Sequence, residues 1–239
     1  MPAKNASAEP ATAVGCSSDH ELVLEIHERL LSQYGLPDGS RRSDPTEELI
    51  HTMLSQNTND VNRDRAFASM WDTFGSWKAV AEAPAPALAE AIRPGGLGEI
   101  KAPRIQNALR VVHERCGDYD LSFVCALALP EADAWLQSLP GVGPKTAACV
   151  LLFACGKPVM PVDTHIHRVS RRLGLIPDKT TANAAHALMT SLVPENLIYP
   201  LHINIIRHGR RTCRAGRPLC DACVLLDLCP YGQKEVVAG

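Results

Sequence analysis

A lysine at the start of a predicted helix is the residue whose position most suggests chemistry in this 239-residue chain. Lys145 follows the turn sequence Pro140-Gly141-Val142-Gly143-Pro144. Because Pro144 has a fixed φ and no N–H group, it suits the first helical position. A cation in the first turn opposes the helix dipole at a cost of about 0.3–1 kcal/mol. Once partly desolvated, an amine held there is a nucleophile; the ordinary alternative is a solvated surface lysine.

The turn before this lysine predicts an anion site. Gly141 and Gly143 separate a helix expected at 131–139 from the helix that begins at Pro144. The first N–H groups of a helix have no internal partners and lie at the positive end of its dipole, and glycine lets an anion approach them closely. A DNA phosphate fits such a site. An ordinary connection between two helices is the alternative.

Asp163 is the second candidate for chemistry. It follows Pro161 and precedes the helical spacing of Ile166, Val169 and Leu173, so it is expected to cap the N-terminus of a helix. A carboxylate that is held rigidly near an amine can also steer protons and stabilise a positive charge. The capping role therefore does not exclude a catalytic one.

Four cysteines near the C-terminus have the spacing of a single inorganic centre. Their pattern, Cx6CxxCx5C, occupies 17 residues. Four thiolates suit a tetrahedral zinc ion or an iron–sulfur cluster, and the spacing alone leaves both open. A loop without a metal is the alternative. The four are Cys213, Cys220, Cys223 and Cys229, whereas Cys16, Cys116, Cys125, Cys149 and Cys155 are scattered and are interpreted as packing or incidental residues.

Arginines accompany the cysteine pattern and are expected to form a face that contacts phosphates. Basic residues at the end of a helix also offset its dipole, but that does not account for the excess in the loop. The charge distribution agrees, since residues 1–130 hold 12 basic and 18 acidic residues, and residues 131–239 hold 12 and 8. The arginines of this face are Arg210, Arg211, Arg214 and Arg217.

Two further loops have unusual side chains. Residues 54–60 are polar directly after an apolar stripe and contain Gln56 and Asn57; an exposed turn followed by a helix cap is the alternative. Leu97 lies among three glycines, where neighbours cannot pack it well. It is expected either to enter a base stack as an apolar wedge or to cap the following helix hydrophobically.

The chain resembles the endonuclease III branch of the helix-hairpin-helix DNA glycosylase superfamily in two places. The first is LPGVGPKTA followed by PVDTHIHRV, and the second is the cysteine pattern preceded by HGR. The resemblance implies that Lys145 attacks the sugar C1′ of a damaged nucleotide and that Asp163 assists. It also implies that the cysteines hold a [4Fe–4S] cluster. It places Asn57, with Gln56 beside it, in the gap left by an extruded nucleotide, and Leu97 in a loop that probes the duplex.

The function that follows is a bifunctional DNA glycosylase and AP lyase of base excision repair, which forms a lysine Schiff base and cuts the strand by β-elimination. Adenine-removing relatives lack the lysine and add a carboxylate where this chain has Ile50-His51-Thr52, which favours oxidised pyrimidines as substrates; a thymine mismatch or another pyrimidine is the alternative. The competing functions are a lesion-sensing DNA-binding iron–sulfur protein with weak or no catalysis and a redox carrier.

Composition favours an all-α protein, because helix formers dominate and long β-branched alternating runs are missing. The resemblance implies two lobes: a helical barrel at 38–157 that ends in the hairpin, and a cluster lobe at 19–37 and 158–239. Residues 1–18, rich in Ala, Ser, Pro and Thr, are expected to be a disordered tail. The sequence has no apolar run long enough to span a membrane and no secretion signal, so we expect a cytoplasmic, nucleoid-associated protein. We also expect a monomer that binds double-stranded DNA with damaged pyrimidines or abasic sites.

Overall fold

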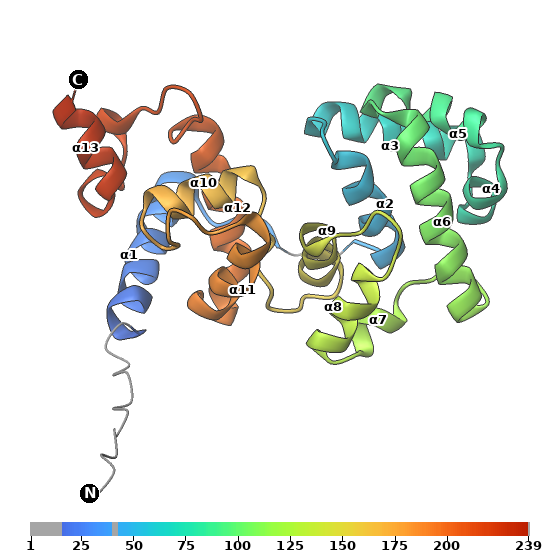
Figure 1. The fold of residues 1–239 in the computed structure, drawn as a ribbon, viewed down its shortest axis with the longest axis horizontal. Coiled ribbons are helices and arrows are strands. Elements are labelled where there is room, and N and C mark those ends of the chain that lie inside the picture. The colour runs from blue at the N-terminus through green and yellow to red at the C-terminus, as the bar shows by residue number, and fades with distance from the viewer. Residues whose placement is uncertain (1–15, 40–42, 239) are drawn as a thin grey trace, which may run out of the picture.

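The computed structural model of this chain describes residues 16–39 and 43–238 and folds them into helices arranged as two lobes (Figure 1). No β-strand occurs in these two ranges. The predicted all-α fold class is therefore confirmed. No helix in the described part of the chain has the length and apolar character needed to cross a membrane.

The first lobe contains the helices of the middle of the chain. Its core is formed by apolar side chains from Leu49 to Leu151, and the long helix α6 crosses it beside α2, α4 and α5. The helices are α2 (Pro45–Ser55), α3 (Asp60–Phe74), α4 (Trp77–Glu82), α5 (Ala85–Ala91), α6 (Gly98–Cys116), α7 (Phe123–Ala126), α8 (Leu129–Gln137) and α9 (Pro144–Cys149), with a 3-10 turn, η1 (Arg93–Gly95).

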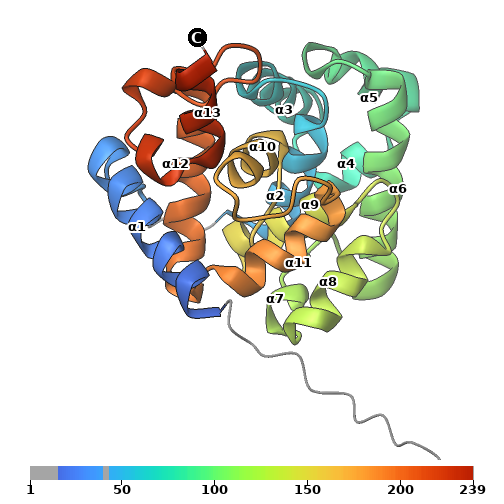
Figure 2. The same ribbon diagram turned by 60° about the vertical axis from the view of Figure 1, so that its left-hand side comes forward.

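The second lobe joins the two ends of the described chain. Helix α1 packs against α12, and α10 lies between α12, α11 and α13 (Figure 2). A separate core that runs from Val23 to Cys229 holds these helices together. They are α1 (Cys16–Tyr34), α10 (Thr164–Arg172), α11 (Ala182–Leu192), α12 (Ile198–Arg211) and α13 (Pro230–Ala238), with 3-10 turns η3 (Glu195–Leu197), η4 (Cys220–Ala222) and η5 (Leu226–Leu228).

Local sequence signals set the ends of the helices that face the space between the lobes. Asp44 caps α2, since its Oδ1 accepts hydrogen bonds from the N–H groups of Thr46 and Glu47, each at 2.9 Å. Asn59 caps α3 in the same way. Helix α9 begins at Pro144, as the turn sequence predicts. These caps fix where the side chains of each first turn lie.

The turn that follows α9 is wider than an α-helical turn. Residues Val150–Ala154 (η2) form a π-helical turn, which widens the backbone after Cys149.

The interpretation of Cys125 and Cys155 as packing residues is wrong, because the two form a disulfide between α7 and the end of this turn. They are 30 residues apart, and only the fold brings their Cα atoms to 4.8 Å.

The predicted tail also needs correction. Residues 1–15 lie outside the described residues, as do 40–42 and 239. Residues 16–18 do not belong to a tail, because α1 begins at Cys16. The apolar spacing of Val23, Ile26 and Leu30 buries one face of this helix in the second core, and the helix begins well before that face.

Candidate active-site cleft

A cleft of about 1190 Å³ lies between the lobes and contains both candidate catalytic residues that the sequence singles out. One wall comes from α2, the loop after it, the first turn of α3 and α9; the other comes from α10 and α12. Lys145, Asp163, Gln56, Asn57 and Arg210 all line it. The tertiary structure thus collects residues that are up to 154 positions apart in the sequence.

Lys145 enters the cleft from the first turn of α9 and is half-buried. One turn later on the same helix, the thiol of Cys149 lies against the lysine side chain, and burial raises the pKa of this thiol to about 11. Cys149 is therefore a neutral neighbour of the amine at physiological pH. The sequence interpretation of Cys149 as a packing residue missed this contact, although the i, i+4 spacing on one helix was the available signal.

Asp163 faces the same cleft from the opposite lobe. It caps α10, and its Oδ1 accepts a hydrogen bond from the N–H of Ile166 at 2.7 Å. The predicted capping role is confirmed. This bond holds the carboxylate in one place while the side chain still lines the cleft with Lys145. A fixed negative charge opposite an amine stabilises a cation formed between them.

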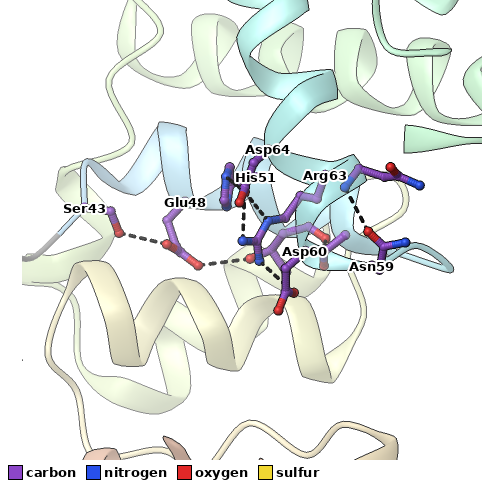
Figure 3. Close-up of polar contacts among 10 residues, drawn as sticks. Ser43, Glu48, His51, Asn59, Asp60, Arg63 and Asp64 are labelled. Atoms are coloured by element: carbon purple, nitrogen blue, oxygen red, sulfur yellow. Dashed lines mark hydrogen bonds and ion pairs between the residues drawn. The ribbon is translucent and has the colours of Figure 1, made fainter. Parts of the chain in front are cut away.

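A second carboxyl, which sequence reasoning missed, lies on α2. Glu48 lines the cleft, and its oxygens accept hydrogen bonds from Ser43 Oγ at 2.8 Å and Thr52 Oγ1 at 3.1 Å (Figure 3). Burial raises the pKa of Glu48, although these hydroxyls and the charges of Lys145 and Arg63 act in the opposite direction. No sequence signal distinguishes Glu48, because an acidic residue in the first turn of a helix is ordinary.

His202 of α12 also lines the cleft. Its side chain is 3% exposed, and burial lowers the pKa of the imidazole to about 4. Its Nδ1 has no hydrogen-bond partner. The ring is therefore neutral at physiological pH, and its unpaired nitrogen is an acceptor at the edge of the site.

The two amide side chains of the loop after α2 have different surroundings. Gln56 Nε2 donates to the carbonyl oxygen of Gly141 at 3.1 Å, so Gln56 joins this loop to the hairpin. Asn57 is exposed in the cleft, with a φ of 55°. Asn57 and Leu97 are the two non-glycine residues with positive φ in the described chain. Backbone strain of this kind concentrates at functional sites.

Leu97 is the N-cap residue of α6 and is half exposed, with a φ of 54°. Gly98 must be glycine here, because a Cβ would lie 2.5 Å from the carbonyl oxygen of Ala89. Behind the loop, Lys101 is 3% exposed, and its Nζ donates to the carbonyl oxygens of Leu54 at 2.7 Å and Gly95 at 2.8 Å. Lys101 therefore fixes the Leu97 loop to the end of α2.

The hairpin glycines differ in what surrounds them. Gly141 has a φ of +82°, and a Cβ there would lie 3.0 Å from Cδ of Arg104. Gly143 has open space where a Cβ would be. An anion can therefore approach the backbone at Gly143 and the first turn of α9 without meeting a side chain at this residue.

The four arginines do not form one face on the cleft. Arg210 lines the cleft, where its Nη1 lies 2.7 Å from Asp60 Oδ2 of the opposite lobe. Burial alone would raise the pKa of Asp60, but the contact with Arg210 and the charge of Arg63 outweigh burial and lower it. The other three are exposed outside the cleft lining, and the guanidinium of Arg211 lies over the ring of Tyr34. These are Arg211, Arg214 and Arg217.

The thiols of the C-terminal pattern line a single cavity against α10 and α12. Arg172 Nη1 donates to Cys213 Sγ, and the N–H of Gly232 donates to Cys229 Sγ, each at 3.3 Å. Such donors fit sulfurs that carry negative charge. Within the described residues, no three Cys, His, Asp or Glu side chains are arranged around one metal ion. The cavity is lined by Cys213, Cys220, Cys223 and Cys229.

Comparisons with known proteins agree with this geometry. Residues 50–195 match the family described as HhH-GPD superfamily base excision DNA repair protein. Endonuclease III of Thermotoga maritima is 34% identical over 215 residues, which are 90% of this chain and 93% of that protein. Two solved structures, a non-covalent endonuclease III–DNA complex and a trapped endonuclease III–DNA covalent intermediate, have TM-scores of 0.77 and 0.76, at 26% and 27% identity, and each covers 91% of this chain and 98% of its own. The chain belongs to the HhH-GPD superfamily of base excision DNA repair proteins.

Proposed function

We propose that this protein is a bifunctional DNA glycosylase and AP lyase that removes oxidised pyrimidines through a Schiff base on Lys145. The observation that carries the proposal is that Lys145 and Asp163 line the same cleft from opposite lobes. The similarity to a trapped covalent intermediate of endonuclease III with DNA supports a covalent step. The family supports damaged DNA as the partner. The proposal includes double-stranded DNA as the substrate form and a monomer that acts in the cytoplasm, at the nucleoid.

The chemistry follows from the two charged groups. The nitrogen lone pair of Lys145 attacks C1′ as the base departs. A proton then passes from this nitrogen to the ring oxygen while the bond from C1′ to that oxygen opens, which gives a Schiff base. Asp163 stabilises the positive charge that develops at the sugar, since its carboxylate is held by the α10 backbone. β-Elimination then cleaves the strand 3′ to the lesion.

The DNA-contacting role is assigned to loops that surround the cleft. Asn57 and Leu97 are exposed and strained, which suits side chains that fill the gap beside an extruded nucleotide. Gly141 and Gly143 present the hairpin backbone to a phosphate. Gln56 would act through the hairpin that it holds, and Arg210 is the arginine that can reach a phosphate in the cleft. Arg211, Arg214 and Arg217 would contact DNA only beyond the cleft.

The residues of the C-terminal cavity fit a [4Fe–4S] cluster. A zinc ion needs its sulfurs converging at about 2.3 Å from one point, whereas each thiolate of a [4Fe–4S] site binds a different iron. Thiols that surround a cavity, with N–H donors to two of them, suit the second arrangement. When bound, the cluster supplies a covalent tie between the end of α12 and the start of α13. The ligands would be Cys213, Cys220, Cys223 and Cys229.

Borohydride trapping tests the proposal. Wild-type protein is mixed with duplexes that carry thymine glycol, an abasic site or no damage, and is compared with Lys145→Ala and with Lys179→Ala, an exposed control lysine. We expect an adduct on both damaged duplexes for the wild type and the control, and none for Lys145→Ala. DNA binding by wild-type protein without any adduct would instead identify a lesion-sensing protein and refute the lyase assignment.

A further inference from the structure

The cleft contains an acidic group that the proposed reaction has not used. Glu48 lies on α2 in the barrel lobe, on the same wall as Lys145, and Asp163 lies on the other wall. Two hydroxyls, Ser43 Oγ and Thr52 Oγ1, hold its two carboxyl oxygens in a fixed orientation (Figure 3). Among the described residues, Glu48 and Asp60 are the acidic side chains that line this wall.

Asp60 and His51 on this side of the cleft are committed to partners, and His202 on the opposite wall is uncharged. Asp60 is paired with Arg210, and this contact keeps its pKa low. His51 Nε2 lies 3.1 Å from Asp64, and burial lowers the pKa of His51. His202 is neutral because burial lowers its pKa as well. None of these three groups is a proton donor to a base at physiological pH, whereas burial favours the protonated form of Glu48.

The charges that face Glu48 come from each neighbouring element. The charged groups are Lys145 on α9 and Arg63 on α3, and the buried thiol of Cys149 on α9 is a neutral titratable neighbour. The positive charges of Lys145 and Arg63 favour the carboxylate, so they oppose the effect of burial on the pKa of Glu48. The cleft is lined across from Glu48 by Asp163, His165, His167, His202, Arg207 and Arg210.

We propose that Glu48 is the catalytic acid that protonates the departing base, an assignment that rests on the proposed lysine chemistry. In this step the bond from Lys145 Nζ to C1′ forms while the bond from C1′ to the base nitrogen breaks. The electron pair of the broken bond stays on the base, which takes the carboxyl proton. The products are a free base, a carboxylate at Glu48 and a cationic amine on the sugar. The two new charges form on one wall of the cleft and attract each other.

The step has a property that makes it separable from strand cleavage. An abasic site has already lost its base, so Lys145 condenses with its aldehyde carbon and the group that departs is water formed from the sugar oxygen, not a base. A general acid that acts on the base therefore contributes to base release alone, where such groups contribute about 10²–10⁴-fold. A residue that merely held α2 or the lysine in place would contribute to both reactions.

The test compares Glu48→Gln with Glu47→Gln, which removes an exposed acid from the same helical turn. The amide that Glu48→Gln introduces is close in shape to the carboxyl but has no acidic proton, and the two hydroxyls can reorient to it. In single-turnover assays on a thymine glycol duplex we expect base release to fall by about 100-fold or more in Glu48→Gln. Cleavage of an abasic duplex should stay within about twofold of wild type, and Glu47→Gln should match wild type in both.

Retained abasic cleavage also shows that Glu48→Gln is folded. If that variant does not fold, wild-type pH profiles replace it: base release should decrease as pH rises through a pKa that the abasic reaction lacks. Equal losses on both duplexes, no loss on either, or identical pH profiles would overturn the role of Glu48. Failure of the lysine proposal gives a different result, namely no borohydride adduct from wild-type protein on the abasic duplex.

Discussion

The amine of Lys101 lies 2.7 Å from the carbonyl oxygen of Leu54, and the same amine lies 2.8 Å from that of Gly95. Leu54 leads into the loop that carries Asn57, and Gly95 lies two residues before Leu97. One buried cation thus links the two loops whose non-glycine residues have positive φ. Burial lowers the pKa of Lys101, and the two carbonyl dipoles compensate its charge. The strained loops are held as a pair.

The first prediction concerns this link. Lys101→Met should lower the free energy of unfolding by about 2–4 kcal/mol, because two buried carbonyl oxygens lose their donor. Thermal or denaturant unfolding measures the loss. Lys78→Met, which changes an exposed lysine on α4, should leave the midpoint nearly unchanged. Equal midpoints for the two variants would show that Lys101 does not hold the loops together.

Leu97 offers a prediction in which stability and activity move in opposite directions. Leu97→Gly relieves the backbone strain of a bulky residue in the left-handed region, which stabilises the folded state. This gain offsets the cost of glycine, whose backbone has greater entropy in the unfolded chain. We expect a melting temperature equal to or above that of wild type. Base release from a thymine glycol duplex should nevertheless slow, because no apolar wedge remains to hold the duplex open. A variant that is destabilised but fully active would contradict both parts.

The ion pair between Asp60 and Arg210 crosses the cleft with both side chains about half exposed. Such pairs contribute about 0–1 kcal/mol, so Asp60→Asn should barely change stability. It should free Arg210 for a phosphate and steepen the slope of log K against log salt for duplex DNA by about 0.9. Asp72→Asn makes the same change in net charge on the exposed side of α3. If both variants shift the slope equally, the effect is only one of net charge.

His202 predicts a pH dependence of stability. Its pKa is about 4 in the folded protein and about 6.5 when unfolded, so between these values the unfolded chain binds more protons. Stability therefore decreases as pH falls through this window, by about 2 kcal/mol at pH 5 relative to pH 7.5. Other buried histidines add to the decrease.

His202→Gln isolates this contribution, since the amide does not titrate. Melting temperatures between pH 4.5 and 7.5 should fall less steeply for the variant than for wild type. Parallel curves would mean that His202 is not the group that resists protonation.

Several features were readable from the sequence because they depend on neighbours along the chain. Pro144 fixed the start of α9, and Asp163 was recognisable as a cap because the N–H group that it binds lies three residues later. The family resemblance also depended on short continuous motifs, and the comparison with known proteins confirmed it.

Other features depend on pairs that are distant in sequence, and no local pattern indicates them. The disulfide of Cys125 and Cys155, the link from Lys101 to Leu54 and the ion pair of Arg210 with Asp60 each join separate elements.

Glu48 shows the same division within one residue. It was unremarkable in the sequence, because a glutamate in the first turn of a helix has an electrostatic reason to be there. Only packing of α2 against α9 placed it in the cleft beside Lys145, and burial then raised its pKa. The helices, their caps and the lysine follow from the chain because local backbone chemistry sets them. The surroundings of each reactive group follow from long-range packing, because burial and charge depend on which helices meet.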